Sequence, residues 1–264
     1  MDHPDQPGVG RSVALNRSIE VEYLPGGSKR PVTEILHNES AWCVQMMRAG
    51  IDASWQESIS LMVSDELRHG RQCAGMVHAL GGEPVAEIPD SLTDVPLHDD
   101  VEPMEGFLRN ILSVSCLSET VAVALIRAEK NEVSTPEMEA TLDEILADEV
   151  QHARFGWRVL DELAPNLSEA TRLRLSDYLI GAFRHLAEHE LHYLPIDNVP
   201  SEEAAAYGVC DGRDARRLFF DTVEKVIVPR LQEHGFKAEE AWMASQRPMP
   251  LKAGQAQEPQ TQAG

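Results

Sequence analysis

Apolar residues recur every three or four positions through most of the chain, which is the period of an amphipathic α-helix. The pattern predicts helices at about residues 33–49, 54–80, 104–130, 136–163, 168–192 and 213–233. No stretch alternates apolar and polar residues in the way that a half-buried strand does. The sequence therefore predicts an all-α protein.

Breaker and capping residues place the ends of these helices. Glycines follow the first two, and Pro136 lies in the first turn of the fourth. Ser134 stands three residues before Glu137, the spacing of a capping box, and we expect it to cap the same helix. Pro229 lies inside the last helix, where a missing N–H should bend it.

The connection between the second and third predicted helices covers residues 81–103, with four prolines and no helical period. It is too long for a tight antiparallel turn, so we interpret it as a crossover. Two helical hairpins joined by one crossover are typical of a four-helix bundle, with additional C-terminal helices here. We expect one helical domain at 31–246, between a flexible segment 1–30 and a disordered tail 247–264.

One motif occurs twice in the chain. DELRHGR (residues 65–71) and DEVQHAR (residues 148–154) both have the form D-E-x-x-H-x-R, inside two long predicted helices. Residues three apart lie on one helix face, so Glu66 lies beside His69, and Glu149 beside His152. Because carboxylate and imidazole together suit divalent transition metals, we predict that these four residues are metal ligands.

A further carboxylate is expected from the third predicted helix. Glu119 shares a helical face with apolar residues, among them Leu112, Cys116 and Val123. A carboxylate in such a stripe is costly unless it is paired or bound to a metal. Glu119 is therefore predicted to be a metal ligand too.

The first predicted helix offers two candidates for a matching carboxylate. Glu39 shares a face with apolar residues and lies 11 residues before Gly50, while Glu66 lies 12 after Ser54, which would set the two acids side by side in a hairpin. In the second hairpin, Glu119 and Glu149 are 30 residues apart. Glu34 lies 32 residues before Glu66 and Glu39 lies 27 before it, so this spacing is closer to that of Glu34. We favour Glu39 and keep Glu34 as the alternative.

The charge and composition of the chain limit the kinds of partner and the cellular location that we expect. Acidic residues outnumber basic ones 44 to 23, for a formal net charge of −21, which argues against nucleic acid and anionic membrane surfaces. The longest apolar run, residues 121–126, is too short to cross a membrane, and the N-terminus lacks the features of a signal peptide. The four cysteines are scattered, as in proteins of a reducing compartment. We expect a cytoplasmic protein.

With these motifs the chain resembles the ferritin-like di-iron carboxylate superfamily, and a bacterial group of ferritin-like domain proteins in particular. That site takes one Glu from each of two helices and a Glu-x-x-His from each of two others. The resemblance covers about residues 31–195, and YGVCDGRDARRLFFDTVEKVIVPRL (207–231) is similar to the group's C-terminal helix. It implies two iron ions, with manganese or a mixed pair as alternatives, and the ligands Glu39 (or Glu34), Glu66, His69, Glu119, Glu149 and His152.

The resemblance also assigns roles to the residues around the ligands. Asp65 would orient His152, and Asp148 would orient His69, each fixing the tautomer of the ring across the helix pair. Arg71 and Arg154 lie off the ligand face, so we expect them to form structural salt bridges.

The implied activity is an O2-dependent oxidase or oxygenase acting on a small organic substrate. A ferroxidase or peroxide-scavenging protein is the alternative, and a metal-free helical interaction protein is a third reading. An external electron donor and a homodimer stay open. The role of a second group of histidines also stays open, since its side chains would be either surface groups or extra metal ligands. The group consists of His185, Glu188, His189 and His192.

Overall fold

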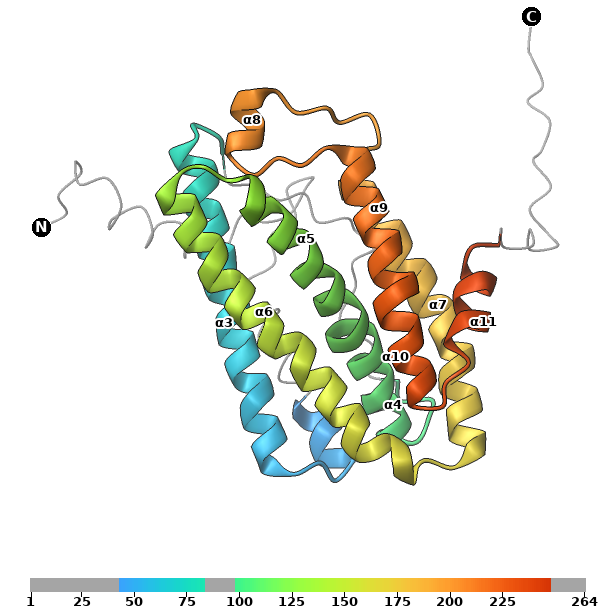
Figure 1. Ribbon diagram of the computed structural model, residues 1–264. Coiled ribbons are helices and arrows are strands. Elements are labelled where there is room, and N and C mark those ends of the chain that lie inside the picture. The colour runs from blue at the N-terminus through green and yellow to red at the C-terminus, as the bar shows by residue number, and fades with distance from the viewer. Residues whose placement is uncertain (1–42, 84–97, 248–264) are drawn as a thin grey trace, which may run out of the picture.

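The structure is a computed structural model that describes residues 43–83 and 98–247, and every regular element in these ranges is a helix (Figure 1). The all-α prediction is confirmed. Of the first predicted helix, only 43–49 lies within the described residues, and 43–48 is helical. The four-helix arrangement therefore stays a prediction. The flexible ends predicted at 1–30 and 247–264 also stay predictions, because all of these residues except Arg247 lie outside the described residues.

Four long helices form the main part of the fold. They are α3 (Ala53–Ala79), the continuous helix of α4 (Pro103–Asn110), η2 (Ile111–Ser118) and α5 (Glu119–Glu132), then α6 (Pro136–Leu163) and α7 (Glu169–Tyr193). In Figure 1, α3 and α5 run upward, and α6 runs downward and packs against both of them. Since α3 ends at the upper end and α4 begins at the lower end, the chain between them joins opposite ends of the molecule, as a crossover requires.

The C-terminal part adds a second continuous helix and several short ones. The long helix consists of α9 (Gly212–Thr222), η4 (Val223–Ile227) and α10 (Val228–Glu233). It agrees with the helix predicted at 213–233. The short helices, which the pattern did not predict, are η3 (Ala164–Asn166), α8 (Glu202–Ala206) and α11 (Ala238–Ser245).

Two local predictions need correction. The N-cap of α6 is Thr135 and makes no side-chain cap, so the capping box of Ser134 and Glu137 is wrong. Ser134 instead donates its backbone N–H to the carbonyl of Ala206 at 2.9 Å, which draws it out of the capping position. At Pro229 the irregularity is not a simple bend but the π-helical turn η4 just before it, whose wider winding gives room near the carbonyl that the proline ring crowds.

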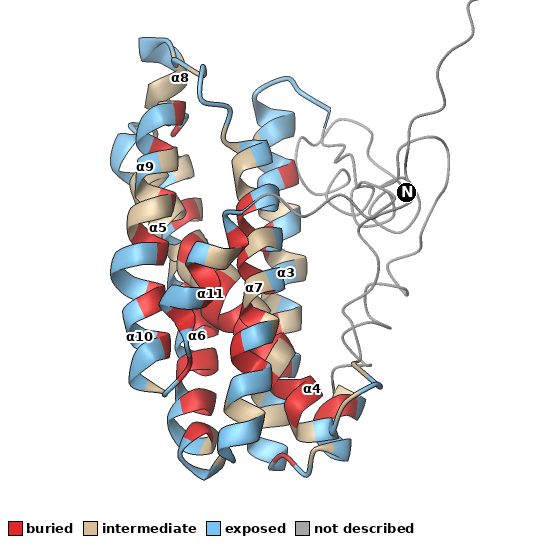
Figure 2. Ribbon diagram, turned by 90° about the vertical axis from the view of Figure 1, so that its right-hand side faces the viewer, coloured by how far each residue is buried: buried red, intermediate tan, exposed pale blue. Residues whose placement is uncertain are grey.

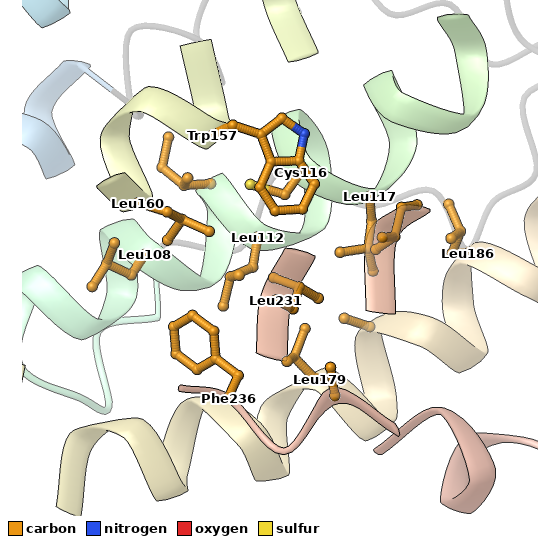
Figure 3. Packing of buried hydrophobic residues seen from close by; sticks show 14 of the residues in the cluster. Leu108, Leu112, Cys116, Leu117, Trp157, Leu160, Leu179, Leu186, Leu231 and Phe236 are labelled. Carbon is orange, nitrogen blue, oxygen red and sulfur yellow. The ribbon is translucent and has the colours of Figure 1, made fainter. Parts of the chain in front are cut away.

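The core lies where η2, α6, α7 and α10 face one another. Figure 2 shows the buried positions gathered on these inward faces, and Figure 3 shows Leu112, Cys116, Trp157, Leu179 and Leu231 packed together. Each of the fully buried leucines contributes roughly 1.5–3 kcal/mol relative to an exposed one. This core fixes η2, and with it the start of α5, against α6.

A glycine sets the distance between these two helices. A Cβ built on Gly156 of α6 would lie 2.4 Å from the Cβ of Ser115 and 3.1 Å from the Sγ of Cys116, so only glycine allows this approach. Ser115 and Cys116 belong to η2, directly before α5. The close contact therefore holds the first residue of α5 in register with the middle of α6.

One described helix, Pro103–Glu132, is long and apolar enough to cross a membrane, and 33% of its most apolar stretch is buried inside the protein. The sequence analysis considered only uninterrupted apolar runs and did not single out this helix, because single charged residues interrupt its apolar stretch. One such helix is weak evidence, since core helices of soluble proteins reach the same length and hydropathy.

Candidate metal centre

The predicted ligands within the described residues meet between three helices. Glu66 and His69 lie on α3, Glu149 and His152 on α6, and Glu119 is the first residue of α5. α6 packs against both α3 and α5. One ligand atom from each of Glu66, Glu119, Glu149 and His152 lies within 4.8 Å of the others.

The two Glu-x-x-His pairs interlock. Nδ1 of His152 lies 3.0 Å from Oε1 of Glu66 and 3.2 Å from Oε2 of Glu149. Nδ1 of His69 lies 3.7 Å from the other oxygen of Glu66 and 3.2 Å from the other oxygen of Glu149. Each of the two carboxylates therefore presents one oxygen to each imidazole, with the ring centroids 6.0 Å apart.

The far side of each ring faces the aspartate of the opposite motif. Nε2 of His152 lies 3.2 Å from Asp65, and Nε2 of His69 lies 3.1 Å from Asp148. These are the cross-helix contacts that the family resemblance implied. A carboxylate at Nε2 holds the proton of the neutral ring there, which leaves the lone pair on Nδ1, toward the cluster.

Arg68 joins the two aspartates. Its Nη1 lies 2.8 Å from Asp65 and its Nη2 2.5 Å from Asp148. The sequence analysis assigned salt bridges to Arg71 and Arg154, and this is wrong, because neither forms an ion pair with any residue that the structure describes. Arg68 was missed, although it lies three residues after Asp65 and so on the same face of α3.

The carboxylates at the centre repel one another. Burial, a hydrogen bond to Glu149 and the negative charges of Glu149 and Glu66 raise the pKa of Glu119 well above its usual range. The pKa of Glu149 is lowered despite its burial, because His152, His69 and Glu119 all stabilise its charged form. Of the two coupled carboxylates, Glu119 is therefore the one whose neutral form the surroundings favour when no cation is in the cluster.

The imidazoles supply positive charge to the same cluster. Burial opposes the charged form of His69, but contacts with Glu149, Glu66 and Asp148 outweigh it and raise the pKa to about 10. The pKa of His152 rises to about 11, where Glu149, Glu66, Glu119 and Asp65 likewise overcome burial. The carboxylates therefore require cations beside them, either protons on the two rings or metal ions.

One buried atom indicates that metal ions fit better than protons. Nδ1 of His69 has no hydrogen-bond partner, although Glu149 is 3.2 Å away, because the two groups are not aligned for a hydrogen bond. Buried nitrogens without partners are rare in folded proteins. Carboxylate oxygens and imidazole nitrogens are also a donor set suited to iron and manganese, so the residues fit a dinuclear metal centre.

The cluster has two unequal halves. The His152 half contains His152, Asp65 and Glu119, the His69 half contains His69 and Asp148, and both share Glu66 and Glu149. Glu119 lies close to His152, and among the described residues no third acid lies in the corresponding position beside the cluster face of His69. The candidates for that position, Glu39 and Glu34, lie outside the described residues.

The α7 histidines do not join the cluster. His185, His189 and His192 are exposed, and His189 contacts Glu190 at 3.2 Å. α7 packs on η2, α4 and α11, away from the ligand face of α3. These side chains are therefore surface groups among the described residues, which is the first of the two alternatives that the sequence left open.

No family model, curated protein or solved structure matches this chain. The likeness to ferritin-like proteins therefore rests on the motifs of the sequence.

Proposed function

We propose that this chain is a non-haem dinuclear iron protein of the ferritin-like kind, which uses O2 to oxidise or oxygenate a small organic molecule. The observation that carries the proposal is the arrangement of Glu66 and Glu149. Each gives one oxygen to each of two imidazole Nδ1 atoms, at 3.0–3.7 Å. Two metal positions that share two carboxylates account for this geometry.

The surrounding residues orient and insulate these ligands. Asp65 and Asp148 hold the Nε2 protons of the two rings, which fixes the tautomer and makes Nδ1 a stronger donor. Arg68 fixes both aspartates at once. Glu149 and His152 are buried, so the charge of their side of the cluster is little screened by water.

Iron at both positions would supply the electrons that reduce O2, and the carboxylates would stabilise the more oxidised metal. The ligand types do not select sharply between iron and manganese, so a manganese or mixed pair would use the same residues. An external donor would return the centre to its reduced state after each turnover.

One observation favours the alternative, in which iron or peroxide is itself the substrate. The side chain of Glu66 is 46% exposed, against 8% for Glu149, so a small ion or peroxide can approach the cluster at Glu66. Fe(II) oxidation that continues well beyond the bound metal would favour this ferroxidase function.

The test combines metal content with O2 uptake in the full chain. After anaerobic loading with Fe(II), we expect about two iron ions per chain and a single uptake of O2 when air is admitted. Glu149→Ala removes a carboxylate shared by both positions and should abolish both signals. Glu137→Gln, at an exposed position in the first turn of α6, is the control. Unchanged O2 uptake by Glu149→Ala contradicts the proposal.

A further inference from the structure

A cavity of about 690 Å³ lies at the upper end of the molecule in Figure 1. α5, the start of α6, the end of α7 and the segment from α8 to α9 enclose it. Apolar side chains form much of its wall, among them Met76, Leu125, Leu142 and Tyr207. A cavity of this size that combines an apolar wall with polar groups is typical of small-molecule sites.

Glu129 is the notable polar group of this cavity. It is half-buried and forms no hydrogen bond or ion pair through its carboxylate with any residue the structure describes. Burial raises its pKa to about 6. Burial first and the charge of Glu129 second raise the pKa of the thiols of Cys210, in the cavity wall, and Cys73, in α3, so the carboxylate lies near both.

The charge of the cavity wall has one sign. Among the residues that the structure describes, four acidic ones line it, Glu129, Glu132, Asp211 and Asp214, and none of the lining residues is Lys, Arg or His. Asp211 is occupied as the N-cap of α9, and Asp214 pairs with Arg217. Glu129 and Glu132 thus remain for a ligand, and they favour a cation.

The cavity lies along the helices from the metal centre. Leu125 is six residues beyond Glu119 on α5, and Leu142 is seven before Glu149 on α6, so both lie about 9–11 Å from the cluster along the axis at 1.5 Å per residue. Glu129 is ten residues beyond Glu119, or about 15 Å along α5. The apolar wall therefore lies between Glu129 and the cluster.

We propose that this cavity binds a small organic amine, with its ammonium group against Glu129 and its apolar body along Leu125, Leu142 and Met76 toward the metal centre. The cavity and its charge carry the binding of the amine. That the amine is the molecule oxidised rests on the proposed function of the metal centre.

Calorimetric titration of the full chain with n-octylamine, 1-octanol and octanoate tests the binding. n-Octylamine should bind more tightly than the other two, which have the same chain but a neutral or negative head. Glu129→Gln should weaken n-octylamine roughly tenfold to 100-fold, the usual effect of losing one charged hydrogen bond, with 1-octanol unchanged. Glu137→Gln, outside the cavity, should bind as the unaltered protein does.

A second variant guards against an indirect effect of Glu129→Gln. Ala205→Trp, in the short helix α8 of the cavity wall, should fill the space and weaken n-octylamine and 1-octanol alike. Equal affinity for n-octylamine and 1-octanol, or no loss in Glu129→Gln, overturns the inference.

Metal content separates this inference from the proposed function. Glu129→Gln should keep the iron content of the unaltered protein, because it contacts no ligand. Amine binding without metal binding would leave the amine site standing and remove the oxidase function. Metal binding without selectivity for n-octylamine would leave the metal centre standing and remove the amine site.

Discussion

The two halves of the cluster come from nearly the same motif but differ in their surroundings. In the His152 half, Glu119 from α5 stands beside the shared carboxylates, within 4.8 Å of His152 and Glu149. In the His69 half, the described residues supply no such acid, and Nδ1 of His69 is left without a hydrogen bond. Repeated sequence therefore does not mean equal sites, because each half also depends on a helix outside the repeat.

The two halves also differ in what positions the acid beside them. Glu119 is held by η2, whose close packing on Gly156 fixes the start of α5. The corresponding acid of the His69 half must come from residues 31–42, if the resemblance holds. We therefore expect the His152 half to bind metal more tightly, and the four predictions below test this order.

The largest effect is expected from Glu119→Ala. It should remove the metal of the His152 half, so that iron falls from about two ions to about one per chain. It should also remove both the hydrogen bond and the charge repulsion between Glu119 and Glu149, which act in opposite directions, so the stability of the metal-free protein should change little. Iron analysis and thermal unfolding check both, with Glu137→Gln, at an exposed position in the first turn of α6, as the control. An iron content that stays near two would show that Glu119 is not a ligand.

The next effect concerns the missing acid. Glu39→Ala should lower the iron content by about one ion, taken from the His69 half, while Glu34→Ala leaves it unchanged. The two variants serve as controls for each other. The reverse result would assign the ligand to Glu34, and no change in either would mean that the His69 half needs no acid from this segment.

A smaller effect is expected from the aspartates that face the rings. Asp65→Asn should weaken metal binding in the His152 half, and Asp148→Asn in the His69 half, by about 10- to 100-fold each, as loss of such hydrogen-bond partners does elsewhere. Mn(II) titration followed by electron paramagnetic resonance can resolve the two affinities. Loss of both sites in either variant would instead indicate that Arg68 couples the halves.

The smallest effect is a pH dependence of the metal-free protein. Since the pKa values of His69 and His152 are raised to about 10 and 11, their contribution to stability is complete below about pH 6.5 and is lost as pH rises toward 10–11. The lowered pKa of Glu149 contributes in the opposite sense, at the acid end. The metal-free protein should therefore melt at a lower temperature at pH 9 than at pH 6, by about 2–4 °C for each kcal/mol lost.

The metal-loaded protein is the comparison for this measurement. Metal ions replace the protons on the two rings, so its melting temperature should fall less over the same range. Equal losses in both forms would mean that the rings keep their protons when metal is present.

Helical periodicity was enough to find α3, α6 and the Glu–His pairs that face each other from them, because residues three apart share a face. The same rule could have identified Arg68, because it lies three residues after Asp65 and so on the same face of α3. The π-helical turns could not be predicted, since η2 depends on the fit of Ser115 and Cys116 to Gly156, which is a tertiary contact. Ser134 was misassigned for a similar reason, because its partner Ala206 lies 72 residues away.

Anomalous X-ray scattering from crystals of the Fe(II)-loaded chain tests the central claim most directly. The account predicts two iron peaks, each beside Nδ1 of one of the two histidines, His69 and His152, with Glu66 and Glu149 reaching both. A single peak between the rings, or iron bound elsewhere, would contradict it.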